Sequence, residues 1–127
     1  YVLIDIHWFK CKGGVWCELT KLDLEHKTLK GMDGVFVLWY GSSAAPNVVR
    51  IGSGNISSEL TKLKRDLSMI AFFHLGLNVT WAELPLSRAK GVHKFLVDTL
   101  RPRIDENTPN VSPVEAELPW ASAVPAK

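Results

Sequence analysis

Four residues within the first 26 positions carry the kinds of atom that bind zinc. They are His7, Cys11, Cys17 and His26, which together supply two nitrogens and two sulfurs, the ligand number of a structural zinc site. Their spacing matches none of the common zinc templates, so we interpret them as core or surface residues without a metal. Two cysteines are too few for a disulfide scaffold, and we expect reduced, partly buried thiols in a cytoplasmic protein.

The glycine-rich segment at residues 52–54 is not a phosphate-binding loop of the Walker type. Gly52-Ser53-Gly54 is not followed by the Gly-Lys-Ser/Thr that cradles nucleotide phosphates. The sequence contains no serine nucleophile elbow either. Any chemistry therefore depends on residues that the fold brings together.

The composition and the hydrophobic pattern predict a single α+β domain. The chain has 127 residues, of which 46% are hydrophobic and 22% charged, close to the averages of globular proteins. Residues 35–40 form a nearly continuous apolar run bounded by glycines, which is typical of a central strand, and residues 48–51 are its expected antiparallel partner. We expect a small, mostly antiparallel sheet made of this hairpin and a strand at 77–84, flanked by helices at 55–66 and 87–101.

Residue types at the expected helix ends support these two helices. Asn55 is a good N-terminal cap for a helix in which Ile56, Leu60 and Leu63 recur at helical spacing. Ser87 is the expected cap of the second helix. Pro102 is expected to end it, because the residue before a proline disfavours the helical region.

The flanking segments, 1–33 and 106–127, are expected to pack onto the domain at 34–105. The first contains two β-rich stretches, 2–9 and 15–19, that we expect to pair as an N-terminal hairpin. The second is rich in proline and predicts an extended tail anchored by Leu118-Pro119-Trp120. No apolar run reaches the roughly 18–20 residues needed to span a bilayer, so we expect no membrane partner.

The ordered set of strands and helices between residues 34 and 105 resembles the GIY-YIG nuclease domain. Gly34-Val35-Phe36 stands where the family has Gly-Ile-Tyr, and Arg50-Ile51-Gly52 stands where it has Tyr-Ile-Gly. Asn55-Ile56 matches the family's Asn-Leu at the start of a helix, and Pro102 to Asp105 matches its closing segment. The resemblance implies a GIY-YIG-like fold with a cleft lined by Phe36, Arg50, Glu59, His93 and Asp105.

The same resemblance implies that the family's chemistry is replaced at each cleft position. Phe36 lacks the hydroxyl of the first tyrosine, and Arg50, at the second, cannot act as a base. Glu59 stands where the family has an essential arginine, and a carboxylate there repels phosphate. His93 stands at the metal-binding glutamate and suits transition metals better than Mg²⁺. Asp105 replaces the closing asparagine.

Basic residues surround the cleft that the resemblance implies. Residues 34–105 carry nine basic and five acidic side chains, although the net charge of the chain is only +2. Phosphate contacts from such residues give salt-dependent binding of nucleic acid, whereas charges on exposed helix faces otherwise serve solubility. The candidates for nucleic-acid binding are Arg50, Lys62, Lys64, Arg65, Arg88 and Lys94.

Aromatic residues in the expected strands and helices could bind nucleic acid in a second way, by stacking on its bases. We interpret Trp39, Tyr40, Phe72 and Trp81 as core residues. A stacking platform for single strands requires at least two of them to be exposed together.

Three functions follow as hypotheses. The first is a GIY-YIG-like module without nuclease chemistry or cofactor that binds DNA, RNA or a protein. The second is a divergent metal-dependent endonuclease that cleaves phosphodiester bonds with Glu59, His93 and Asp105 and a divalent metal such as Mg²⁺ or Mn²⁺; Glu59 and His93 are its candidate metal ligands. The third is an interaction protein without a nucleic-acid partner.

Overall fold

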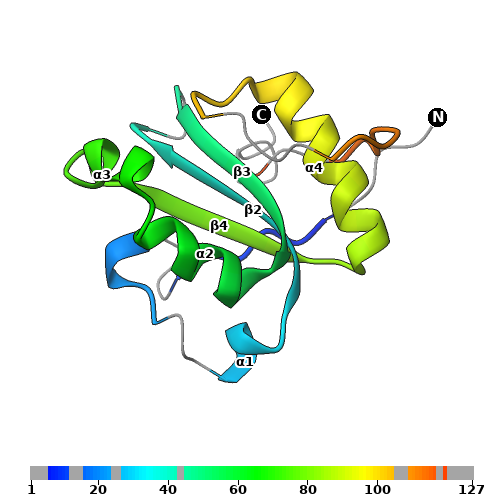
Figure 1. Ribbon diagram of the computed structural model, residues 1–127, viewed down its shortest axis with the longest axis horizontal. Helices are drawn as coiled ribbons and strands as arrows, with labels where there is room; N and C mark the ends of the chain where they lie inside the picture. The colour runs from blue at the N-terminus through cyan, green and yellow to red at the C-terminus, as the bar shows by residue number, and fades with distance from the viewer. Residues whose placement is uncertain are drawn as a thin grey trace, which may run out of the picture.

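The computed structural model describes residues 6–11, 16–23, 27–42, 45–104, 109–116 and 119. It confirms an α+β architecture built on an antiparallel sheet with the strand order β1-β4-β2-β3 (Figure 1). The strands are β1 (Cys17–Glu18), β2 (Asp33–Tyr40), β3 (Asn47–Asn55) and β4 (Asn78–Glu83). The helices are η2 (Leu19–Lys21), α1 (Lys27–Lys30), α2 (Ile56–Lys64), α3 (Leu67–Phe73) and α4 (Leu86–Leu100).

The hairpin of β2 and β3 contacts β4 and the helices on both faces of the sheet, as expected for a central strand at the apolar run 35–40. Its register places Gly34 opposite Gly54 and Phe36 opposite Gly52, and shifts between Leu38 and Trp39. The strand β3 runs to Asn55, four residues beyond the predicted end at 51. Glycines 52 and 54 were expected to leave the sheet, but their missing side chains instead make room for neighbouring groups, and Gly54 adopts a positive φ of 131°.

The strand β4 pairs with β2 on one side and with short N-terminal segments on the other. Cys17 pairs with Val79, and the Phe9 N–H donates to the Trp81 carbonyl at 2.9 Å. The expected N-terminal hairpin is therefore wrong for the described residues, because both segments pair with β4 rather than with each other. Alternating apolar residues specify a strand face but not its partner.

Cys11 and Cys17 are joined by a disulfide with their Cα atoms 5.1 Å apart. The prediction of reduced thiols was wrong, and the assignment to the cytoplasm loses the support that reduced thiols gave it. The bond connects the segment that ends at Cys11 to β1. It therefore ties together the two pieces of chain that lie along β4.

The sheet is covered on both faces, by α2 and α3 on one and by α4 on the other (Figure 1). The even-numbered positions of β2 face the first layer, and the odd-numbered ones face the second, because strand side chains alternate. The first core contains Phe36, Leu38, Leu60, Leu63 and Met69. The second contains Val35, Val37, Trp39, Val92 and Leu96.

The helix α4 begins at Leu86, one residue before the predicted cap. Pro85 occupies the cap position and its carbonyl accepts the N–H of Ala89 at 2.8 Å, so Ser87 lies inside the helix. At the other end Arg101 has a left-handed φ of 52°, and its N–H donates to the Val97 carbonyl at 3.0 Å. Glycine usually fills this position, since other residues are strained there.

The C-terminal segment packs on α4 through its described residues. The Val114 N–H donates to the Gly91 carbonyl at 2.9 Å, and the Val114 side chain lies where a Cβ on Gly91 would be. Ala116 and Pro119 are buried. The predicted neighbours of Pro119 in the anchor, Leu118 and Trp120, lie outside the described residues.

Candidate functional site

A small pocket lies where β3 forms the edge of the sheet between α2 and α4. Its volume is about 60 Å³, far below the 300–1,000 Å³ of pockets for drug-sized ligands. It is therefore suited to a single small group, such as a few water molecules or one oxyanion, rather than to a whole metabolite. Its lining residues come from β2, β3, α2 and α4: Phe36, Arg50, Ile51, Gly52, Ser53, Glu59, Leu63 and His93.

The wall of the pocket is set by the fit between Phe36 and Gly52. These residues face each other across the β2–β3 ladder. A Cβ on Gly52 would overlap the outer edge of the Phe36 ring, whose Cε2 atom would be only 2.8 Å away. Glycine at position 52 thus allows the ring to lie over the strand, and the ring takes up space that a side chain would otherwise fill.

Arg50 is buried in the pocket wall and is held by an acidic partner. Its side chain has a relative exposure of 9%, and its Nη1 lies 3.9 Å from Oδ2 of Asp66. Asp66 caps α3 by accepting hydrogen bonds from the Ser68 N–H at 2.9 Å and the Ser68 hydroxyl at 2.7 Å. The hydrogen bonds from the Ser68 hydroxyl and the Ser68 N–H hold the pKa of Asp66 below its ordinary value of 3.8. Burial opposes them, and the Arg50 charge adds the smallest lowering effect. The guanidinium therefore has an ionised partner at neutral pH.

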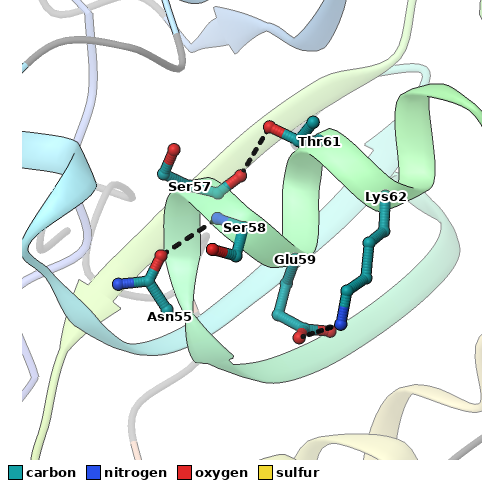
Figure 2. A network of polar contacts seen from close by, with 6 residues as sticks. All are labelled: Asn55, Ser57, Ser58, Glu59, Thr61 and Lys62. Atoms are coloured by element: carbon teal, nitrogen blue, oxygen red, sulfur yellow. Dashed lines mark hydrogen bonds and ion pairs between the residues drawn. The ribbon is translucent and has the colours of Figure 1, made fainter.

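Glu59 lies in the first turn of α2 (Figure 2) and is one of the residues that line the pocket. The helix starts where it was predicted to, because the Asn55 side chain accepts the Ser58 N–H at 3.0 Å. One turn later the Lys62 ammonium donates to Glu59 Oε2 at 3.3 Å. Figure 2 shows this pair on the same side of the helix, so the Glu59 carboxylate already has a neighbouring cation.

His93 enters from α4 on the other face of the sheet and is 97% buried, with a relative exposure of 3%. Its Nδ1 lies 2.9 Å from the Ser53 hydroxyl, which can donate to it or accept from it according to the tautomer. Sequence reasoning missed Ser53. Its only signal was its position between two glycines next to a predicted strand, and its partner lies 40 residues further along the chain.

The structure brings together four of the five cleft residues that the resemblance implied. Phe36, Arg50, Glu59 and His93 line the same pocket, although they belong to four different elements. The fifth, Asp105, lies outside the described residues. This arrangement provides a buried cation, an imidazole paired with a hydroxyl and a carboxylate paired with a lysine. Neither Phe36 nor Arg50 carries a hydroxyl that could exchange a proton.

The basic candidates for nucleic-acid binding are spread over both helical layers. Only Arg50 lines the pocket. Lys62 pairs with Glu59, and Lys94 donates to Asp98 Oδ1 at 3.0 Å. Arg65 and Arg88 are exposed and Lys64 is half-buried.

The disulfide rules out Cys11 and Cys17 as ligands of the zinc site that the sequence analysis set aside. Cys11 and Cys17 are bonded to each other, so neither is a thiolate ligand. His7 is exposed and its ring stands edge-on to Phe9 at 4.8 Å, and His26 lies outside the described residues. Within the described ranges, no three or more His, Cys, Asp or Glu side chains form a group that could hold a metal ion.

None of the helices in the described part of the chain is both long and apolar enough to cross a bilayer. Comparison of the chain with family models, curated proteins and solved structures finds no match. The geometry of the pocket and its surroundings is therefore the basis for any function.

Proposed function

We propose that this chain is a GIY-YIG-like domain that has lost the family's nuclease chemistry and binds nucleic acid. The observation that carries the proposal is the convergence of Phe36, Arg50, Glu59 and His93 in one small pocket. These positions were chosen from the resemblance alone, and they lie on four separate elements. Their convergence is what a GIY-YIG-like cleft requires.

The side chains in that pocket favour binding over cleavage. Phe36 has no hydroxyl with which to transfer a proton, and Arg50 places a guanidinium rather than a hydroxyl at the second position. Glu59 stands where a phosphate-stabilising cation is required, and Lys62 offsets its charge at 3.3 Å. The exposed Arg65 can then attract phosphate, and Arg50 adds a buried positive charge that lies 3.9 Å from Asp66.

A binding assay with labelled DNA and RNA at low salt tests this proposal. Replacing Lys62, Lys64 and Arg65 together by alanine should weaken binding and reduce its salt dependence, because each lost phosphate contact lowers the slope of log K against log salt by about 0.7–0.9. The matched control replaces Lys21, Lys27 and Lys90, three exposed cations on η2, α1 and α4. It removes the same charge and should have a smaller effect.

Two results would contradict the proposal. If no oligonucleotide binds, or if the two triple variants bind equally well, an interaction protein without a nucleic-acid partner is the better description. If plasmid DNA is nicked in the presence of Mg²⁺, Mn²⁺ or Zn²⁺, the loss of nuclease chemistry is refuted.

The presence of Glu59 and His93 in the same pocket favours a divergent metal-dependent endonuclease as a second candidate. A carboxylate and an imidazole are suitable ligands for a transition metal. Metal-dependent nicking that His93→Ala abolishes would support this candidate over the first.

A further inference from the structure

Tyr40 and Phe72 form a stacked, half-buried pair on the α3 side of the sheet, at the margin of the first core. Their ring centroids are 6.4 Å apart and their planes are inclined by 28°. Both side chains are half-buried, whereas Trp39 and Trp81 are buried. The interpretation as core residues holds for Trp39 and Trp81, whereas Tyr40 and Phe72 pack against the first core from its half-buried margin.

Arg103 places a cation over the same aromatic pair. Its guanidinium carbon lies 5.9 Å from the centre of the Tyr40 ring. The backbone holds it there, because the N–H groups of Arg103 and Ile104 donate to the carbonyls of Val48 and Val49 at 3.1 and 2.8 Å. Arg103 is exposed and makes no ion pair with any other described residue. Its planar guanidinium is therefore available for a further stacking or phosphate contact.

Arg101 lies two residues before Arg103 in the chain and lines an open groove. The groove, at the end of α4, has a volume of about 350 Å³ and is lined by Val97, Asp98, Arg101 and Pro102. The Asp98 carboxylate in it is paired with Lys94 at 3.0 Å. Arg101 is exposed and keeps a strained left-handed backbone at a position where glycine is preferred. Arg101 and Arg103 thus both expose positive charge, and Arg103 is the one that reaches the Tyr40 ring.

Tyr40 of the aromatic pair lies on the same face of the hairpin as Phe36, one of the residues that line the pocket at the sheet edge. Phe36 and Tyr40 are four residues apart on β2 and therefore share a face, about 13 Å apart along the strand at about 3.3 Å per residue. A double helix cannot place an unpaired base on the aromatic rings, because its bases are stacked and paired.

We propose that Tyr40, Phe72 and Arg103 form a stacking site for an unpaired nucleobase, so that the nucleic acid bound by this domain is single-stranded. This inference rests on the proposed function. Stacking of a base on an aromatic side chain is sequence-tolerant, because every base has a π face, and arginine adds a cation–π contribution. The site is separate from the pocket, and it distinguishes single-stranded from double-stranded nucleic acid rather than one sequence from another.

The test compares binding of a fluorescent oligothymidine strand with binding of the same strand annealed to its complement. Phe72→Leu removes one ring and Arg103→Lys keeps the charge but removes the planar group. Each should weaken single-strand binding by at least about fivefold and leave duplex binding nearly unchanged. Phe73→Leu is the matched control, since Phe73 is an adjacent, half-buried phenylalanine outside the stack. Arg103 is exposed, so its variant should fold normally.

The outcomes separate this inference from the proposed function. If Phe72→Leu and Arg103→Lys bind oligothymidine as the wild type does, while the Lys62, Lys64 and Arg65 triple variant binds it more weakly, the stacking site is refuted and the nucleic-acid module stands. The stacking site is also refuted if Phe73→Leu weakens binding as much as Phe72→Leu does. If neither form of the oligonucleotide binds, both proposals fall.

Discussion

The fit of Phe36 over Gly52 makes a quantitative prediction for the substitution Gly52→Ala. The new methyl group would overlap the Phe36 ring, and the ring has little room to move because it is only 2% exposed. Overpacking a core costs about 1–3 kcal/mol. The reduced freedom of alanine in the unfolded chain offsets about 0.4–1 kcal/mol of that. We therefore expect a net loss of about 1–2 kcal/mol in the free energy of unfolding.

A double-mutant cycle with Phe36→Leu identifies the cause of that loss. Leucine has no atom at the position of the outer ring edge, so Gly52→Ala should cost close to nothing in its presence. The coupling free energy should then be about 1–2 kcal/mol, within the range found for residues in contact. Urea unfolding followed by circular dichroism measures it. In thermal melts Gly52→Ala should lower Tm by about 4–8 °C, since unfolding entropies are about 2.1 cal/mol/K per residue.

Two results would refute this reasoning. One is a neutral Gly52→Ala variant, and the other is a loss of stability that is equally large in the Phe36→Leu background. Gly31→Ala is the control, because a Cβ on Gly31 would have no atom within 4 Å. It should leave stability unchanged or raise it by up to about 1 kcal/mol.

Three other predictions concern parts of the fold outside the pocket. Replacing Cys11 and Cys17 by serine should lower the free energy of unfolding by about 2 kcal/mol, because the disulfide closes a short loop of sequence separation 6. Reduction of the wild type should lower its free energy of unfolding by the same amount, whereas the stability of the variant should not change with reductant. Arg101→Gly should raise stability by about 1 kcal/mol in urea unfolding, because it relieves the left-handed backbone; unchanged or lower stability would contradict this. Asp66→Asn keeps a good helix cap but removes the negative charge. The pKa of Asp66 is lowered in the folded state, so the aspartate stabilises the fold at pH values above its unfolded-state pKa. That stabilisation is lost as the pH falls through the folded-state pKa. The difference in Tm between wild type and Asp66→Asn should therefore be largest near neutral pH and shrink in acid, and a gap that is constant with pH would contradict the prediction.

Much of the fold follows from local sequence patterns. The apolar run at 35–40 marks β2, and Asn55 marks the start of α2. These features depend on residues close together in the chain, whose propensities and spacing are visible in one dimension. The extension of β3 was missed because Gly52 and Gly54 have the composition of a loop. Their place in the strand depends on close approach by Phe36 and Glu59, which belong to other elements.

Pairings between distant segments were decided only by the tertiary structure. The two N-terminal segments pair with β4, and the disulfide between Cys11 and Cys17 forms because β4 holds Phe9 and Cys17 along one edge. A cysteine count does not contain that information, since bond formation requires the two Cα atoms to be close.

The candidate site divides in the same way. The sequence alone supplied the residue types at Phe36, Arg50 and His93, and so determined that neither Phe36 nor Arg50 brings a hydroxyl to the pocket. The tertiary structure decided which side chains meet: the Ser53–His93 hydrogen bond and the stack of Phe72 on Tyr40 join residues 40 and 32 positions apart. Such contacts depend on how helices pack against a twisted sheet, which the spacing of residues along one chain does not specify.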